Sequence, residues 1–294
     1  MIIDIHAHTS NRVLWGLHSS KANLVTLEKE AEEYGVIYTV LLATHFPYKG
    51  TGLHNMELLE RIQERWPRRL SQFRVFGSLD VMNDFQGGLE ELHSLAKSRV
   101  IFGIKLYPGY QNFNPSDPNV FPVYELAQEF GLPVMFHTGE LHHCCPKEKR
   151  EKGQGKCGSV CWVDRLGFLA EPKQMEGAIK NFPRTKFILA HLGNPYFEQT
   201  RILMRRYSNV FTDTSGQFVS GTAEDTLEYR AVLKKELEKF LMIPGAENRI
   251  MFGTDFPIQS YADAIALVKS LGLPQETEEK IFFRNAARLL KIIF

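Results

Sequence analysis

The sequence lacks both a strong charge imbalance and a long apolar run. Lys and Arg total 35 against 34 Asp and Glu, which gives a formal net charge of +1. A chain this close to neutrality has no field that would gather nucleic acid or anionic lipid. No stretch of about 18 apolar residues appears, and the N-terminal MIIDIHAH lacks the basic and apolar regions of a signal peptide. We therefore expect a cytoplasmic protein with a small-molecule substrate and no membrane or nucleic-acid partner.

Cysteine is also scarce, and its clustering suits free thiols or a metal better than a disulfide framework. The four cysteines, Cys144, Cys145, Cys157 and Cys161, fall in one short window instead of being spread along the chain. With the neighbouring His142 and His143 they could hold a structural zinc, but they lack the Cys-x-x-Cys pairs that usually do so. The alternative is a reduced loop without a metal.

What the chain does contain is a regular alternation of short β-branched and aliphatic runs with longer amphipathic segments. Eight runs predict strands, which begin near Ile2, Val36, Phe73, Val100, Leu132, Thr185, Val210 and Arg249. Apolar residues at intervals of three and four predict helices over 24–35, 55–66, 87–97, 123–131, 172–182, 197–207, 223–241 and 261–272. This alternation predicts an α/β fold, a single (β/α)₈ TIM barrel that spans residues 1–294 as one domain.

One interval between predicted strands is too long for a single βα unit. It separates the runs at Leu132 and Thr185 and holds an insertion over about residues 140–170, which contains all four cysteines. The charge run from Lys147 to Lys152 predicts a solvated loop there. We therefore expect a cysteine-rich loop after the fifth strand, and a last helix over residues 276–292 that ends the fold.

Several predicted strands end in residues that bind metals. Side chains alternate along a strand, so His6 and His8 project to the same side at its carboxyl end. Three further runs also end in a histidine or an aspartate: His137 ends VMFH, His191 ends FILAH and Asp255 ends IMFGTD. Any one of these could be a structural residue, but together at the catalytic end of a barrel they indicate a divalent metal site.

The motifs around these residues resemble those of the amidohydrolase superfamily, and within it the amidohydrolase-related (amidohydrolase 2) group of compact barrel enzymes. They are DIHAH, GIKLYP, FHTG, AHLG, GTDFP and, in the last helix, RNAARLL, and the resemblance covers essentially the whole chain. It implies a metal-dependent hydrolase with His6, His8, His137 and Asp255 near the metal. It also implies that His191 is a ligand of a second metal or a catalytic base.

Such ligands suit particular chemistry. Imidazole and carboxylate favour zinc, although manganese and other divalent ions fit the same residues, and one or two ions are expected. A divalent ion of this kind activates water for attack on a carbonyl group. We expect Asp255 to take the proton of that water and return it to the leaving group, while His191 holds the developing oxyanion.

Lys105 and three other residues complete the predicted pocket. Lys105 lies in GIKLYPGY, which resembles the dihydroorotase segment whose lysine is carboxylated and bridges two metals. The alternatives are a free lysine that binds substrate and a salt-bridged structural lysine. Tyr107 and Arg165 are further candidates for substrate binding, and Thr214 for the pocket wall, with a packing or surface role as the alternative for each.

The expected reaction is hydrolysis of an amide, lactone or ester-like bond in a small molecule. The alternative is non-oxidative decarboxylation of an aromatic or unsaturated carboxylic acid, which related barrels perform. No strongly placed arginine is evident that would hold a departing carboxylate, which favours hydrolysis. The sequence does not fix the substrate, the native metal or the oligomeric state, so a homo-oligomer stays open.

Overall fold

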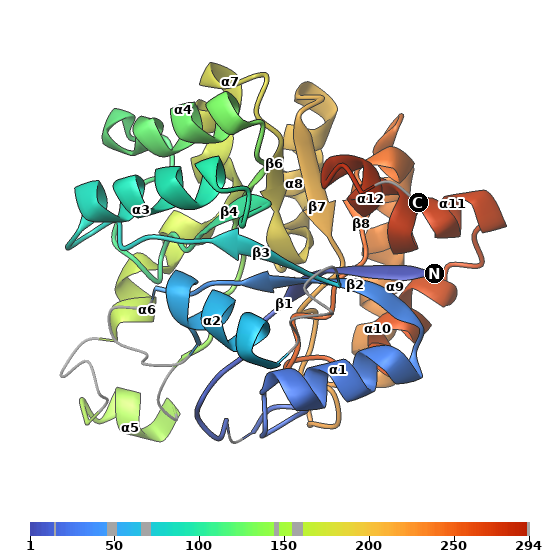
Figure 1. Cartoon of the computed structure of the whole chain (residues 1–294). Coiled ribbons are helices and arrows are strands. Elements are labelled where there is room, and N and C mark those ends of the chain that lie inside the picture. The colour runs from blue at the N-terminus through green and yellow to red at the C-terminus, as the bar shows by residue number, and fades with distance from the viewer. Residues whose placement is uncertain (15, 46–51, 66–71, 144–146, 155–160, 293–294) are drawn as a thin grey trace.

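Eight parallel strands form one barrel in which every strand neighbours the next in the sequence (Figure 1). The computed structural model describes the chain except for residues 15, 46–51, 66–71, 144–146, 155–160 and 293–294. The strands are β1 (Ile2–Ala7), β2 (Val36–Leu42), β3 (Phe73–Gly77), β4 (Gly103–Leu106), β5 (Val134–Phe136), β6 (Phe187–Leu189), β7 (Val210–Asp213) and β8 (Ile250–Met251). The barrel closes between its first and last strands, where the Ile5 amide donates to the Phe252 carbonyl (3.0 Å) and the His8 amide to the Phe256 carbonyl (2.7 Å). The predicted TIM barrel is thus confirmed.

Helices follow the strands and cover the outside of the barrel (Figure 1). They are α1 (Leu24–Glu33), α2 (Asn55–Arg65), α3 (Phe85–Lys97), α4 (Phe121–Phe130), α7 (Glu176–Asn181), α8 (Phe197–Arg206), α9 (Leu227–Leu241) and α10 (Tyr261–Lys269). Each corresponds to one of the eight predicted amphipathic segments. The segment predicted over 172–182 begins with a 3₁₀ turn, Pro172–Met175, before α7.

The last predicted helix, over residues 276–292, is present over 275–289 but is not a regular α-helix throughout. It consists of α11 (Gln275–Glu279), a π-helical turn (Lys280–Arg284) and α12 (Asn285–Leu289). In the π turn the Ile281 carbonyl accepts a hydrogen bond from the Phe252 amide, just after β8 (2.9 Å). A carbonyl that bonds to the barrel is withdrawn from the regular helical ladder, which is a recognised cause of such a turn.

Two apolar layers support the barrel. The inner layer includes Ile3 and Ile5 of β1, Met135 of β5 and Met251 of β8, and α12 packs against it through Ala286. The outer layer lies between strands and helices and includes most of the buried helical residues. Because these layers fix both sides of each strand, the strand ends are held rigidly where the candidate site lies.

The segment after β5 contains two short helices, α5 (Lys147–Glu151) and α6 (Trp162–Leu166). Part of the charged run, predicted as a loop, therefore forms a helix instead, and Glu148 and Lys149 on it are exposed to solvent. Cys144, Cys145 and Cys157 lie outside the described residues, so the predicted cysteine-rich loop stays a prediction. Among the helices that the structure describes, none has the length and apolar character needed to cross a membrane.

Candidate metal centre and active site

The predicted metal ligands gather at the carboxyl ends of the strands. His6, His8 and Asp255 approach one another closely: Asp255 Oδ1 lies 3.5 Å from His6 Nε2 and 3.4 Å from His8 Nε2. His137, after β5, and His191, after β6, form a second close pair, with 3.2 Å between His137 Nδ1 and His191 Nε2. The ring centroids of His6 and His191 are 4.7 Å apart, which joins the two groups into one centre.

The inward direction of His6 depends on an irregularity in β1. Ile3 and Ile5 belong to the inner layer, so regular alternation would send Asp4 and His6 outward. The Asp4 side chain does point away from the inner layer, and its carboxylate accepts hydrogen bonds from the amide and hydroxyl of Thr254. The register of β1 against β2 shifts between Asp4 and Ala7, and beyond this shift His6 turns to the centre.

Asp213, the last residue of β7, is a member of the centre that the sequence analysis missed. Its Oδ2 lies 3.1 Å from His6 Nδ1, and its Oδ1 accepts hydrogen bonds from the amides of His191 (3.0 Å) and Ser215 (3.1 Å). The carboxylate oxygens and ring nitrogens of His6, His191 and Asp213 form a second group that could hold a metal. The feature that could have indicated Asp213 is its position at the end of a predicted strand, but the neighbouring Thr214 was predicted for the pocket instead.

Hydrogen bonds fix which ring nitrogens carry protons. A carbonyl oxygen only accepts, so His191 Nδ1 donates to the Ser215 carbonyl (3.1 Å) and His137 Nε2 donates to the Glu140 carbonyl (3.1 Å). His6 Nδ1 donates to the Asp213 carboxylate in the same way. In the neutral imidazoles the remaining nitrogens carry lone pairs. His6 Nε2 therefore faces Asp255 without a proton, and the lone pairs of His137 and His191 face each other.

Burial keeps these imidazoles neutral. Desolvation, followed by the charge of Lys105, lowers the pKa of His8 to about 3. Desolvation also lowers the pKa of His191 to about 4, against the charge of Asp213, and lowers the pKa values of His6 and His137 well below the usual range. At neutral pH protons therefore do not compete with a metal for the ring nitrogens.

Two of the candidate ligands occupy left-handed backbone positions. His191 has φ 61° and Asp255 has φ 53°, a region that side chains with a Cβ adopt at some cost. Hydrogen bonds hold both in place, because the Asp255 amide donates to the His6 carbonyl (2.7 Å) and the His191 amide to the Asp213 carboxylate (3.0 Å). The strand ends thus orient these two side chains through their backbone as well as through packing.

Lys105 belongs to β4 and is completely buried. Its Nζ has no hydrogen-bond partner among the described residues. Desolvation lowers its pKa to about 8, while the carboxylates of Asp213 and Asp255 act in the opposite direction. A buried amine with a lowered pKa is suited to chemistry, and among the described residues no hydrogen-bonded carboxylate holds Lys105 as a structural salt bridge.

The two other predicted substrate-binding residues lie differently. The Tyr107 hydroxyl donates to the Ala43 carbonyl (2.7 Å), and its ring lies 5.3 Å from Lys105 Nζ and 6.4 Å from the His8 ring. Tyr107 is buried and supports the centre from one side. Arg165 is exposed on α6 and is not one of the residues that line the cavity described next.

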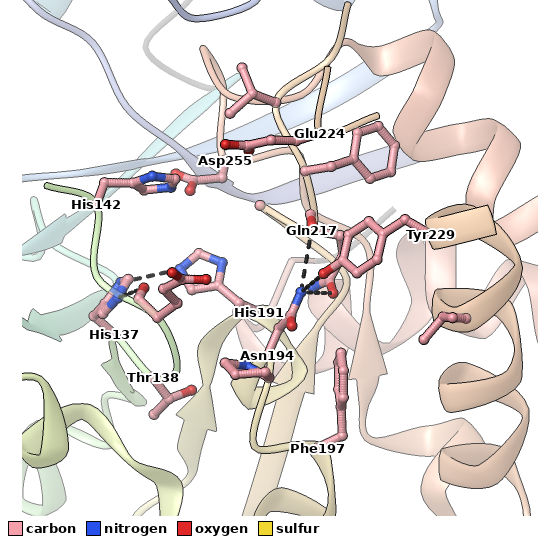
Figure 2. Close-up of a pocket in the computed structure, with 16 residues that line it drawn as sticks. His137, Thr138, His142, His191, Asn194, Phe197, Gln217, Glu224, Tyr229 and Asp255 are labelled. Carbon is pink, nitrogen blue, oxygen red and sulfur yellow. Dashed lines mark hydrogen bonds between the residues drawn. The ribbon is translucent and has the colours of Figure 1, made fainter. Parts of the chain in front are cut away.

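A cavity of about 530 Å³ opens onto the centre. Figure 2 shows His137, His191 and Asp255 at one side of it, and Phe197 and Tyr229 at the other. The wall also includes the carboxylates Glu140 and Glu224, the amides Asn194 and Gln217, and Phe218. None of the described residues that line it is a lysine or an arginine. The chamber is therefore apolar and aromatic in part, with acidic rather than basic polar groups.

A comparison with protein families identifies the chain. The family model described as "Amidohydrolase" matches residues 3–292, which is nearly the whole sequence. The chain belongs to the amidohydrolase family of enzymes. This confirms the family predicted from the strand-end motifs. A comparison with curated proteins finds no match.

Solved structures of similar fold include both hydrolases and decarboxylases. A 5-carboxyvanillate decarboxylase from Sphingomonas paucimobilis has 20% identity and a TM-score of 0.62 over 92% of this chain and 84% of that chain. A probable 2-pyrone-4,6-dicarboxylic acid hydrolase from Acinetobacter baumannii has 16% identity and a TM-score of 0.67, with 99% of each chain covered. A dihydroxybenzoic acid decarboxylase from Polaromonas sp. JS666, with bound manganese, has 15% identity and a TM-score of 0.70 over 99% of this chain and 97% of that chain. At these identities the structures share the fold, and the reaction has to be argued from the site.

Proposed function

We propose that this protein is a metal-dependent hydrolase that cleaves an amide, lactone or ester-like bond of a small molecule. The observation that carries the proposal is the direction of the imidazole lone pairs. His137 Nδ1 and His191 Nε2 face each other at 3.2 Å, each with its N–H turned away to a carbonyl. Two lone pairs this close repel unless a cation lies against both, so the arrangement favours a bound metal.

The spacing of the donor atoms also fits a divalent ion. Ligands about 2.1 Å from zinc or a similar ion are separated by roughly 3.0 to 3.4 Å in octahedral or tetrahedral geometry. The separations here are 3.2 Å in the pair His137–His191, 3.4 Å between His8 and Asp255, and 3.5 Å between His6 and Asp255. We assign these five residues as ligands, with zinc as the first candidate and manganese as the second.

Asp213 is a positioning residue in this proposal. Its carboxylate accepts the Nδ1 proton of His6, and the pKa of Asp213 is held far below its usual value by His6 and His191 in spite of burial. An ionised partner fixes both the ring orientation and the tautomer, so that Nε2 of His6 stays available to the metal. Ser215 supports the same arrangement, since its hydroxyl lies 3.0 Å from the Nδ1 atoms of both His6 and His191.

The catalytic steps follow from the same groups. A divalent ion bound here would lower the pKa of water and polarise the scissile carbonyl group. Asp255 lines the cavity and is placed to accept the proton of the attacking water and to deliver it to the leaving group. His191 acts as a ligand and not as the expected oxyanion donor, because its one ring N–H is already donated to Ser215.

The number of ions depends on Lys105. A carboxylated Lys105 would carry a negative charge and could bridge the group around His6 and the pair His137–His191. A free Lys105 would instead place a cation beside a single ion and attract the developing negative charge of the substrate. Its buried Nζ, without a hydrogen-bond partner among the described residues, accommodates either state.

The alternative is a decarboxylase, the activity named for two of the structures that share this fold. The cavity favours hydrolysis. A carboxylate substrate is most strongly held by arginine or lysine, whereas the described lining residues include Glu140 and Glu224 and no such cation. An uncharged lactone or amide, or one with a cationic group, meets less repulsion there.

The test is a substrate panel with the enzyme loaded with Zn²⁺ or Mn²⁺. We expect turnover among neutral or cationic lactones and N-acyl compounds, loss of that turnover in Asp255→Asn, and no release of carbon dioxide from aromatic acids. Carbon dioxide release without hydrolysis would replace the proposal by the decarboxylase. If well-folded protein with intact His6 and His8 took up neither metal, both the hydrolase and the decarboxylase proposals would be overturned.

A further inference from the structure

A second group of metal-binding side chains lies outside the active centre, in the segment after β5. The structure brings together His143, Cys161 and Asp164, whose ligand atoms all lie within 4.8 Å of one another. His143 Nε2 and Asp164 Oδ1 are 2.8 Å apart, and Cys161 is a free thiol at the N-cap of α6. His143 comes from the other end of the segment, so the group is assembled by folding.

The donor set has the chemistry of a zinc site. Thiolate, imidazole and carboxylate are all zinc ligands in proteins, whereas the soft thiolate is a poor ligand for magnesium or calcium. The cysteine spacing argued against such a site because it lacks paired Cys-x-x-Cys. Tertiary structure removes this objection, since a histidine and an aspartate take the places that further cysteines would fill.

The surroundings favour a structural role. Cys161 packs against a small apolar cluster of Tyr107, Tyr110, Leu141, Val163 and Ala170. The side chain of His143 is 24% exposed and that of Asp164 is 55% exposed, so an ion could enter from solvent and keep a water molecule as a further ligand. The alternative is an ion pair between His143 and Asp164 with the Cys161 thiol beside it and no metal. At this exposure such an ion pair would contribute little to stability.

We infer that His143, Cys161 and Asp164 bind a Zn²⁺ ion that is separate from the active centre and ties the chain at His143 to the start of α6. Binding removes the proton of the Cys161 thiol and uses the neutral imidazole of His143. The ion would thereby fix one wall of the substrate cavity. His142, adjacent to His143, lines that cavity, and its amide donates to the Tyr110 hydroxyl (2.8 Å). The Tyr110 ring packs 4.9 Å from the ring of His137.

Cobalt substitution separates this site from the active centre. The proposed active-centre ligands are histidines and an aspartate, so a sulfur-to-cobalt charge-transfer band in the near ultraviolet reports only a thiolate site. We expect Co²⁺-loaded protein to show this band, His6→Asn/His8→Asn to retain it, and Cys161→Ser to lose it. A band that is absent, or that keeps full intensity in Cys161→Ser, would overturn the inference.

Zinc content gives an independent measurement. In the His6→Asn/His8→Asn background, Cys161→Ser and His143→Ala should each lower bound zinc by one equivalent per chain. His18→Ala is the matched control, because His18 pairs with Glu30 at 3.3 Å and is not part of a described metal-binding group. If His143→Ala retains as much zinc as His18→Ala, the pair with Asp164 is an ion pair only. Neither measurement depends on turnover, so the zinc inference can fail while the proposed hydrolysis holds, and the reverse.

Discussion

Gly216 offers a sharp test of the active centre because a single methyl group there would enter it. A Cβ built on Gly216 lies 2.7 Å from His191 Nδ1 and 2.8 Å from Asp255 Oδ2. Ordinary contact begins near 3.4 Å, so in Gly216→Ala the two side chains have to withdraw by roughly 0.6 to 0.7 Å. Both are proposed metal ligands, and Asp255 is also the proposed base.

The size of the effect follows from this displacement. Misplacing a catalytic group by about 1 Å costs on the order of 100-fold in rate, and disturbing the support of a ligand costs roughly 10- to 100-fold in metal affinity. We therefore expect Gly216→Ala to bind Mn²⁺ and Zn²⁺ about 10- to 100-fold more weakly and to lose turnover by a similar factor. The positive φ of Gly216, +61°, adds a stability cost of about 1 to 2 kcal/mol.

Gly245→Ala is the matched control. Gly245 has φ +75° and no atom within 4 Å of a built Cβ, so alanine there carries the same backbone cost without displacing a neighbour. Metal affinity is measured by competition with a chelator, and stability by thermal unfolding of the metal-free proteins. The reasoning is refuted if Gly216→Ala loses stability as Gly245→Ala does yet keeps full metal affinity and turnover.

Four further outcomes are expected. Asp213→Asn should lower metal affinity by about 10- to 100-fold through the lost partner of His6, and unchanged affinity in a chelator competition would remove its positioning role. Asp255→Asn should lower turnover at least 100-fold in protein that still contains metal, and full turnover would exclude Asp255 as the base. Lys105→Gln should leave one ion per chain if Lys105 is carboxylated, and intact-mass measurement of the native protein should then show the mass of one added carbon dioxide. Stability of the metal-free protein should fall as the pH drops from about 6.5 to about 4, because the lowered pKa of the buried histidines, such as that of His191, lets the unfolded chain bind protons first. Thermal unfolding checks this last outcome, which a flat profile over that range would contradict.

The barrel was predictable because its pattern is local. Parallel strands that are covered on both faces appear in the sequence as short aliphatic runs. In the helices between them, apolar residues recur at intervals of three and four residues. Each strand lies where its run predicts it, as β1 and β2 show. The last helix was less predictable, since the π turn at Lys280–Arg284 arises from a bond to Phe252, a residue distant in the sequence.

The candidate site was predictable only in part. Strand ends in a parallel barrel meet at one face, so His6, His8 and Asp255 could be grouped without coordinates. Asp213 was passed over because a strand boundary is uncertain by a residue or two, and one position decides whether a side chain turns inward. His143 was a candidate zinc ligand together with the cysteines, but Asp164 carries no motif, and the meeting of the two residues depends on the tertiary structure.

For this protein the sequence by itself determined the barrel, the amidohydrolase family and the metal-binding character of its strand ends, because these depend on residue type and local period. Only the tertiary structure decided the direction of each side chain. The register shift in β1 turns His6 inward, and the carbonyls of Ser215 and Glu140 select the tautomers of His191 and His137. A ligand is defined by where its lone pair points, and that direction is set by neighbours far away in the sequence.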